Sequence, residues 1–177
     1  YGFNHVDLCI GHGDQVRADY SRWLAERHDD PESLRSPNQF PGNPFEAPQA
    51  FRTKIPEELY PTTYVAEKTI EYLDNHKAGS DKPFFIQCGF PDPHHPFTPP
   101  GKYWDMYDPD DIPVPDAFDH GNHTLPAHLE WFYAEREAGT ANRGSQRGFA
   151  ITEREAREAI ALNYGMITMV DDAIARI

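Results

Sequence analysis

The chain has 177 residues and a formal net charge of −13 at pH 7, from 16 Lys and Arg against 29 Asp and Glu. This acidity disfavours nucleic-acid binding, which usually requires a basic surface, and it disfavours docking on anionic lipid. No apolar run approaches the ~20 residues of a membrane-spanning helix, so no membrane partner is expected. Two cysteines are too few for a disulfide framework. The cellular compartment is left open.

The length fits one ordinary domain, in which 17 prolines predict long loops between a few regular elements. Residues 1–13 are expected to be extended and to close in a Gly-His-Gly turn. Asp14 is expected to cap a helix that continues to residue 28. Four residues would share the buried face of this helix, namely Val16, Tyr20, Trp23 and Leu24.

The next part of the chain predicts a loop and a second helix. Residues 29–61 hold many prolines and no periodicity, and their length indicates a functional loop or an insertion. A helix is expected to begin at Thr62 or Thr63 and to end within residues 75–80. Its inward side chains would be Val65, Thr69, Ile70 and Leu73.

The apolar segment KPFFIQCGF, residues 82–90, is the one strand that the sequence predicts. A nearly continuous apolar run is typical of a strand buried on both faces of a sheet. Cys88 within it is expected to be a small buried side chain. Residues 91–150 follow as a second long loop, with one short helix over residues 128–136.

A capping box formed by Thr152 and Glu155 predicts the start of the last helix. Apolar residues then recur at spacings of three and four, which predicts one buried stripe: Ile160, Tyr164, Ile167, Val170, Ile174 and Ile177. The pattern reaches the last residue without a Gly or Pro stop. Because one strand cannot form a sheet, we expect the chain to be the central part of a larger α/β protein.

The loop PDPHHPF, residues 91–97, is the strongest candidate site. In open α/β sheets ligands bind beyond the carboxyl ends of the strands, and this loop follows the predicted strand directly. Its three prolines restrict the backbone and reduce the entropy lost in holding His94 and His95 in place. A histidine can donate to an oxyanion or pass a proton to a leaving oxygen near neutral pH. The alternative is that both histidines are polar surface residues in a turn.

Other clusters have a functional and a structural interpretation. Asp119-His120-Gly121, with His123 nearby, has the residue types of a metal site, but no predicted strand holds the triplet rigid. His12 and Asp14 flank a turn before a helix, where an anion can bind, but the pattern favours a plain helix start with Asp14 as its cap.

Two further groups point to structural roles. Cys9 has histidines nearby but no pattern of a base and an orienting group, so a nucleophilic role is not supported. Of Asp171 and Asp172 in the last helix, one is expected to face solvent and the other to bind a neighbouring loop.

The order of three blocks carries a resemblance to a known family. A helix with D-Y-x-R-W-L precedes PEELYPTTYVAEKTIEYLDNH, which is followed by KPFFIQCGFPDPHHPFTPPGKYWDMYDPDDIPVP and then by NYGMITMVDDAIARI. Together they resemble the central part of a type I sulfatase, in the alkaline-phosphatase-like superfamily. The most specific block is the apolar segment with the P-H-x-P-F motif.

The resemblance implies an α/β segment of the alkaline-phosphatase-like three-layer fold, with long loops and few strands of its own. It also implies hydrolysis of the sulfate ester of a small molecule or a sugar. Such enzymes use a formylglycine made from Cys or Ser and a calcium ion that binds the sulfate, and histidine and lysine side chains stabilise the sulfate oxygens.

The family's residues transfer to this chain only where motifs match. The histidine of P-H-x-P matches His94, which the resemblance makes the sulfate contact and the acid for the leaving group. His95 fills the variable position and is expected to lie beside the substrate, and His12 lies in a region that often lines the substrate pocket. The C/S-x-P-x-R nucleophile motif is absent, since Cys9 precedes Ile-Gly-His-Gly.

No metal ligand is assigned in this chain, because the calcium ligands are expected before Tyr1 and after Ile177. Asp119-His120-Gly121 comes too early to match the family's late Asp-His-Gly. The chain alone is therefore expected to be inactive. A phosphodiester or phosphonate-ester hydrolase of the same superfamily and a non-catalytic binding domain on the same scaffold are the alternatives. A Cys or Ser motif, a Thr nucleophile or no nucleophile in the flanking sequence would distinguish the three.

Overall fold

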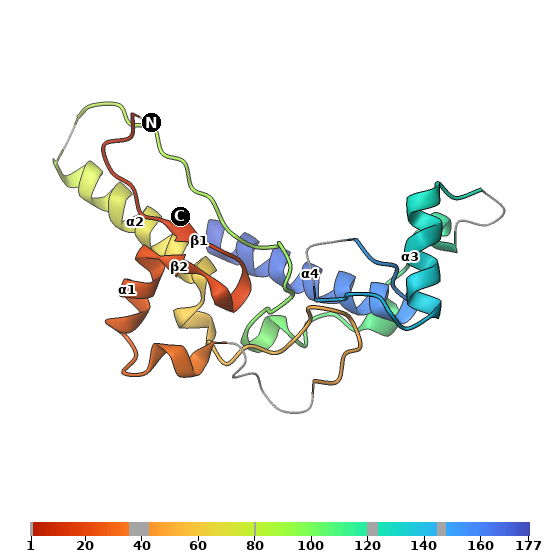
Figure 1. The fold of residues 1–177 in the computed structure, drawn as a ribbon. Coiled ribbons are helices and arrows are strands. Elements are labelled where there is room, and N and C mark those ends of the chain that lie inside the picture. The colour runs from red at the N-terminus through yellow and green to blue at the C-terminus, as the bar shows by residue number, and fades with distance from the viewer. Residues whose placement is uncertain (1, 36–42, 80, 120–123, 145–147) are drawn as a thin grey trace.

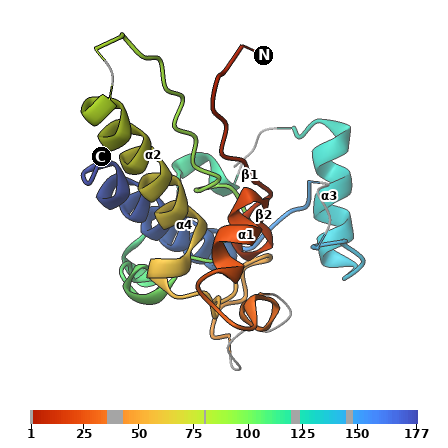
Figure 2. The ribbon, with the colours of Figure 1, turned by 90° about the vertical axis from the view of Figure 1, so that its left-hand side faces the viewer.

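The computed structural model describes residues 2–35, 43–79, 81–119, 124–144 and 148–177. Within these ranges the regular elements are four α-helices and two short strands: β1 (Cys9–Ile10), β2 (Arg17–Ala18), α1 (Asp19–Ala25), α2 (Pro61–Gly79), α3 (Ala127–Glu137) and α4 (Glu153–Ile174). Helices α2 and α4 contact each other, whereas α3 stands apart from α1 and α2 in both views of the ribbon (Figure 1, Figure 2). Long loops and short 3₁₀ turns make up the rest of the described chain.

Helix α1 begins later than the sequence predicts. Residues 17–18 pair antiparallel with residues 9–10, so the chain is extended where a helix was expected. The helix starts only at Asp19, after Ala18 at φ 70°, and no side chain caps it. The prediction that Asp14 is the cap is therefore wrong. The predicted buried face is confirmed, since its four residues lie in one core cluster with side chains of α2: Val16, Tyr20, Trp23 and Leu24.

Helix α2 confirms the second predicted helix. It begins at Pro61, a residue that suits the first turn because its missing N–H would have no partner there. Val65 and Thr69 are buried, and Ile70 and Leu73 are half-buried. The first turn of α2 is therefore the part of the helix most enclosed by the rest of the chain.

The predicted strand over residues 82–90 is wrong. The described residues of this segment form no strand, and their side chains are mostly exposed, including Phe85 at 77% and Cys88. After α2 the chain turns and runs back beside the helix (Figure 2). Along this course Phe84 packs edge-on against His76. A strand needs a neighbour to bond its backbone, and no other described segment pairs with this one.

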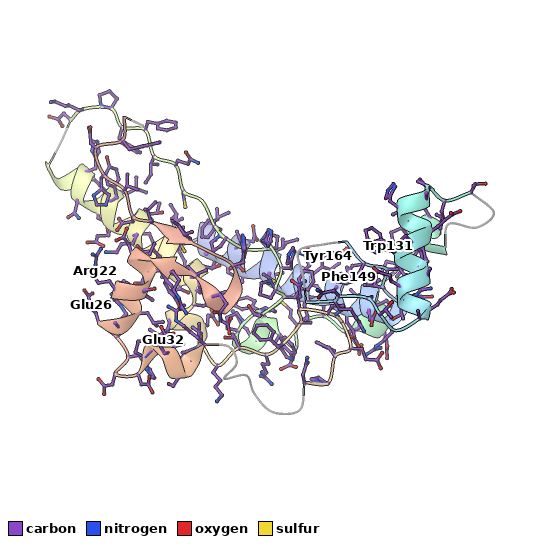
Figure 3. All side chains as sticks on the ribbon, viewed as in Figure 1. Arg22, Glu26, Glu32, Trp131, Phe149 and Tyr164 are labelled. Carbon is purple, nitrogen blue, oxygen red and sulfur yellow. The ribbon has the colours of Figure 1, made fainter. Side chains whose placement is uncertain are left out.

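Helix α4 has the predicted start and a different buried face. The capping box is confirmed: Glu155 N donates to Thr152 Oγ1 at 3.2 Å, and Thr152 N donates to Glu155 Oε2 at 2.8 Å. The predicted stripe is wrong, since Tyr164, visible on α4 in Figure 3, is 43% exposed. The buried face consists of Glu155, Ala156, Glu158, Ala161, Leu162, Gly165, Met166, Met169 and Ala173.

Close approach of a loop explains which face of α4 is buried. A Cβ at Gly165 would lie 2.2 Å from the carbonyl oxygen of Tyr103, so only glycine fits there. Trp104, the next residue, packs with Leu162 in a second core cluster. Tyr103 also donates to Asp172 at 2.8 Å, which confirms that one of the two aspartates binds a neighbouring loop while Asp171 is exposed.

Candidate functional site

Three histidines from two distant parts of the sequence lie together on the surface: His12, and the adjacent pair His94 and His95. The ring of His12 stacks on the ring of His94, with centroids 3.7 Å apart and planes at 12°. The ring of His95 lies 4.1 Å from that of His94. His12 and His94 are exposed and His95 is half-buried. The structure thus brings together the three residues that the sequence nominated as site residues.

The Gly-His-Gly turn presents His12 to the loop. Gly11 has φ +109° and Gly13 has φ +54°, backbone conformations that favour glycine. A Cβ on Gly13 would lie 2.7 Å from Thr98 Oγ1 and 3.0 Å from Pro96 Cγ. The turn therefore rests directly on the chain that carries His94, and this contact holds the two imidazoles face to face.

Replacing Gly13 by alanine is expected to lower the free energy of unfolding by about 2 to 3 kcal/mol, from backbone strain and from the contact with Thr98. Gly139→Ala is the matched control, because Gly139 also has a positive φ of +67° but nothing lies within 4 Å of its Cβ position. The control should lose only the backbone part, about 1 kcal/mol. Urea unfolding followed by circular dichroism measures both, and equal losses would contradict the proposed packing of Gly13.

The loop of residues 91–98 carries His94 and His95 and is called the histidine loop below. It is fixed to three other parts of the molecule. At its start Thr62 Oγ1, in the first turn of α2, donates a hydrogen bond to the buried carboxylate of Asp92. From α4, Asn163 Nδ2 donates to the carbonyl oxygen of Pro93 at 3.0 Å. At its end, the fully buried Thr98 hydroxyl bonds Tyr60 at 2.8 Å. These contacts make the loop a rigid platform for exposed imidazoles.

One contact sets the tautomer of His94. Its Nδ1 lies 2.5 Å from the backbone carbonyl oxygen of His95. A carbonyl oxygen can only accept, so Nδ1 carries the hydrogen of this bond. In the neutral ring Nε2 is then the unprotonated nitrogen, and in the imidazolium Nε2 becomes a second donor. Nε2 is therefore the atom of His94 with which a ligand would exchange a proton.

The electrostatics of the cluster favour few protons on it. Burial lowers the pKa of His12, and the neighbouring His94 lowers it further. Burial likewise lowers the pKa of His95, with smaller contributions from His94 and His12. Two imidazolium rings in face-to-face contact would repel each other. Once one ring of the His12 and His94 stack is protonated, protonation of the other therefore requires a lower pH than it would alone.

Cys9 does not have the properties of a nucleophile. Burial raises the pKa of its thiol to about 12, and the carboxylate of Asp92 adds to this effect. Reactive cysteines have the opposite character, with a lowered pKa beside cationic groups. The structure therefore agrees with the sequence pattern, which gave no support to nucleophilic catalysis at Cys9.

The described residues do not fit a calcium ion. Within them no group of three or more His, Cys, Asp and Glu side chains is arranged to hold a metal. In the histidine cluster the rings of His12 and His94 stack face to face, so their nitrogens do not converge on one point. Of the cluster Asp119-His120-Gly121 and His123, the last three residues lie outside the described part of the chain.

The sequence did not single out two residues that hold the loop. Asp92 lies between two prolines, where an acidic residue is usually a solvent-exposed part of a turn. Its place just before a histidine in a Pro-rich run is the one sequence signal that pointed to it. Asn163 gives no signal, because its bond to Pro93 joins positions 70 residues apart.

No helix in the described ranges is long and apolar enough to cross a membrane.

Comparison with solved structures shows the fold of this segment. The chain superposes on a phosphonate monoester hydrolase of Agrobacterium radiobacter with a TM-score of 0.58 and 24% identity, over 89% of this chain and 31% of that one. The chain therefore folds as a segment of the alkaline-phosphatase-like fold, with few strands of its own. No protein-family model matches the chain.

Curated relatives carry the resemblance at the level of sequence. An arylsulfatase of Clostridium perfringens is 34% identical over 124 residues, which are 68% of this chain and 22% of the relative. The multifunctional alkaline phosphatase superfamily protein PehA of Trinickia caryophylli is 29% identical over 128 residues, 71% of this chain and 24% of the relative. The chain thus spans about a quarter of these relatives. These matches confirm the resemblance to a sulfatase-like segment of the alkaline phosphatase superfamily.

Proposed function

We propose that this chain is part of a sulfuric ester hydrolase and that the histidine loop contacts the sulfate ester. The similarity to an arylsulfatase supports the substrate class. The observation that carries the site is the exposed His94, held on a fixed loop with its Nδ1 bonded to the backbone. A ring held in this way presents one nitrogen to a ligand with little loss of entropy on binding.

In this proposal His94 acts as the acid for the leaving group. When the bond between sulfur and the ester oxygen breaks, its electron pair stays on that oxygen, and Nε2 of His94 imidazolium supplies the proton. Before that step the same N–H donates a hydrogen bond to the sulfate ester. His95 and His12 line the substrate beside it. The sulfuryl group passes to a nucleophile that the described residues do not supply.

The resemblance also implies a formylglycine and a calcium ion. The sequence holds no C/S-x-P-x-R motif, and the described residues do not fit a metal. We therefore propose that both groups belong to parts of the enzyme other than these residues. The share of the relatives that the chain spans, about a quarter, supports this division.

The catalytic domain is divided in the same way. We propose that residues 1–177 are the central part of a sulfatase catalytic domain and that other segments of the polypeptide complete its sheet. Two extended segments near α2, residues 3–10 and 82–90, expose large apolar side chains that a neighbouring strand would cover. These side chains are Phe3, Val6, Leu8, Ile10, Phe84 and Phe85. Stacking of Phe3 on Phe85 at 6.1 Å places these segments side by side.

A phosphonate-ester or phosphodiester hydrolase is the second candidate. The superposition on a phosphonate monoester hydrolase and the match to a multifunctional superfamily protein favour it. A protonated His94 would serve a phosphorus ester by the same acid catalysis. The choice between the two classes therefore depends on the nucleophile and the charge of the anion site, which lie outside the histidine loop.

The test compares the full-length polypeptide with residues 1–177 alone. We expect the full-length enzyme to hydrolyse a chromogenic aryl sulfate with a higher kcat/KM than the matching phosphodiester and phosphonate ester. We expect no turnover by the 177-residue chain, because it supplies no nucleophile. Turnover by that chain would contradict the division of the site, and a preference for either phosphorus ester would move the proposal to the second candidate.

A further inference from the structure

Asp92 is a buried acid at the root of the histidine loop, two residues before His94. Asp92 is only 5% exposed, and burying a charged group lowers the stability of the fold unless the group is hydrogen-bonded. One oxygen accepts the hydrogen bond of Thr62, and the other, Oδ1, has no hydrogen-bond partner. A buried carboxyl with one oxygen unbonded lowers the stability of the fold, and an apolar residue at this position would be more stable.

Among the residues that the structure describes, no cation is placed to balance Asp92. Thr62 faces it from α2, Cys9 from the short sheet and Tyr60 from the turn before α2. Burial raises the pKa of both Cys9 and Tyr60, and the Asp92 carboxylate raises them further. Burial raises the pKa of Asp92 itself to about 6, and the bond from Thr62 acts in the opposite direction. Within the described part of the chain, the bond to Thr62 is therefore the attractive interaction of this carboxylate.

That bond joins the loop to the most enclosed part of α2. Thr62 is 1% exposed in the first turn of the helix, so its hydroxyl is held in place by the surrounding core. From Asp92 the chain continues through Pro93 to His94, whose backbone N–H bonds back to the carbonyl oxygen of Pro91 at 3.3 Å. A displacement of Asp92 would therefore move the ring of His94 relative to His12.

We propose that Asp92 is a positioning residue, whose hydrogen bond with Thr62 fixes the histidine loop on α2 and thereby sets the stack of His94 on His12. The role in catalysis rests on the proposed function, in which His94 is the acid. The geometric part stands without it. Asp92 does not touch the substrate in this proposal, and it acts only through the placement of the two imidazoles.

The test follows the imidazoles directly, in full-length protein labelled with ¹³C in its histidines. The His12 and His94 signals are assigned by single His→Gln variants. Thr62→Val is nearly isosteric and removes only the donor, whereas Thr62→Ser and Asp92→Asn keep a hydrogen bond between the two positions. In Thr62→Val and Asp92→Ala the His12 pKa should rise toward its ordinary value, because the ring is less enclosed and loses its neighbour His94, and the ring contacts between His12 and His94 should be lost.

The conservative variants and a control make the result specific. Thr62→Ser and Asp92→Asn should keep the His12 pKa within about 0.2 unit of that of the unmodified protein. Thr69→Val is the control, because it removes another buried hydroxyl from α2, one that bonds Val65 and Cys88 and not the loop. It should leave both rings unchanged even if it lowers the melting temperature.

Each outcome decides the proposal. A folded Thr62→Val protein with unchanged ring contacts and an unchanged His12 pKa would overturn it, as would the absence of ring contacts between His12 and His94 in the unmodified protein. If Thr62→Val does not fold, the two conservative variants decide, and a shift of the His12 pKa in either would overturn the proposal. The readout needs no turnover, so an enzyme without sulfatase activity would refute the proposed function and leave the positioning role supported.

Discussion

Replacement of His94 by alanine in the full-length enzyme is expected to lower kcat for an aryl sulfate by about 100- to 10,000-fold, the usual contribution of a positioned general acid. The loss should depend on the leaving group. A phenol of high pKa needs the proton as the bond breaks, and a nitrophenol of low pKa leaves without help. We therefore expect the largest loss for unsubstituted phenyl sulfate and a much smaller loss for 4-nitrophenyl sulfate.

The control for this experiment is His128→Ala. His128 is exposed on α3, the helix that stands apart from α1 and α2 (Figure 1), and it should leave kcat unchanged. A uniform loss across all leaving groups would show that His94 binds the sulfate without supplying a proton. A kcat within about threefold of the unmodified enzyme for all esters would contradict any catalytic role, since even one acid–base group contributes far more.

Replacement of Glu158 by alanine is expected to lower the free energy of unfolding by about 3 kcal/mol, because it leaves two amide donors without a partner. Glu158 lies on the buried face of α4 and is 1% exposed. Its Oε2 accepts from the backbone N–H groups of Glu46 and Ala47 at 2.7 and 2.8 Å. Its Oε1 accepts from Arg154 Nε at 2.7 Å.

Glu153→Ala is the matched control on the same helix. Glu153 is exposed and pairs with Arg157 one turn later at 2.7 Å, so its loss should cost no more than about 0.5 kcal/mol. Urea unfolding at pH 7 distinguishes the two variants, and raised salt should weaken only the Glu153 pair. Similar losses for both would show that the backbone amides at residues 46–47 find other partners or water.

The helices with local signals could be predicted from the sequence. The capping box before α4, the helix expected from Thr62 or Thr63 and the short helix α3 each depend on residues within a few positions of one another, which is why they are confirmed. The strand over residues 82–90 failed for the opposite reason. Its apolar composition describes a segment suited to a sheet, but a strand exists only where another chain segment bonds to it.

The buried face of α4 shows a second limit of local patterns. Periodicity selects the large apolar residues such as Tyr164 and Ile167, which are exposed here. The structure instead buries the small residues around Gly165, because the backbone of Tyr103 approaches the helix there. The periodicity of α4 does not predict that Tyr103 approaches Gly165, because Tyr103 lies far away in the sequence.

The candidate site divides in the same way. His94 and His95 could be nominated from the loop PDPHHPF, and His12 from its turn between two glycines. Their contact could not be predicted, because it depends on the tertiary fit of Gly13 against Pro96 and Thr98. Asp92 and Asn163, whose bonds fix the loop on α2 and α4, were missed for the same reason.

The bond from Asn163 to the loop also bears on when the site can form during synthesis. Its two ends are 70 positions apart, and the bonds from Glu158 to residues 46–47 span more than 100. Pairings of such separation carry a large loop-closure cost and form late in folding. On the ribosome the histidines emerge well before α4 does, so the loop lacks its bond to Asn163 at first, although Thr62 and Tyr60 are already available to it. The contacts that α4 makes with the loop therefore form only after α4 has left the exit tunnel.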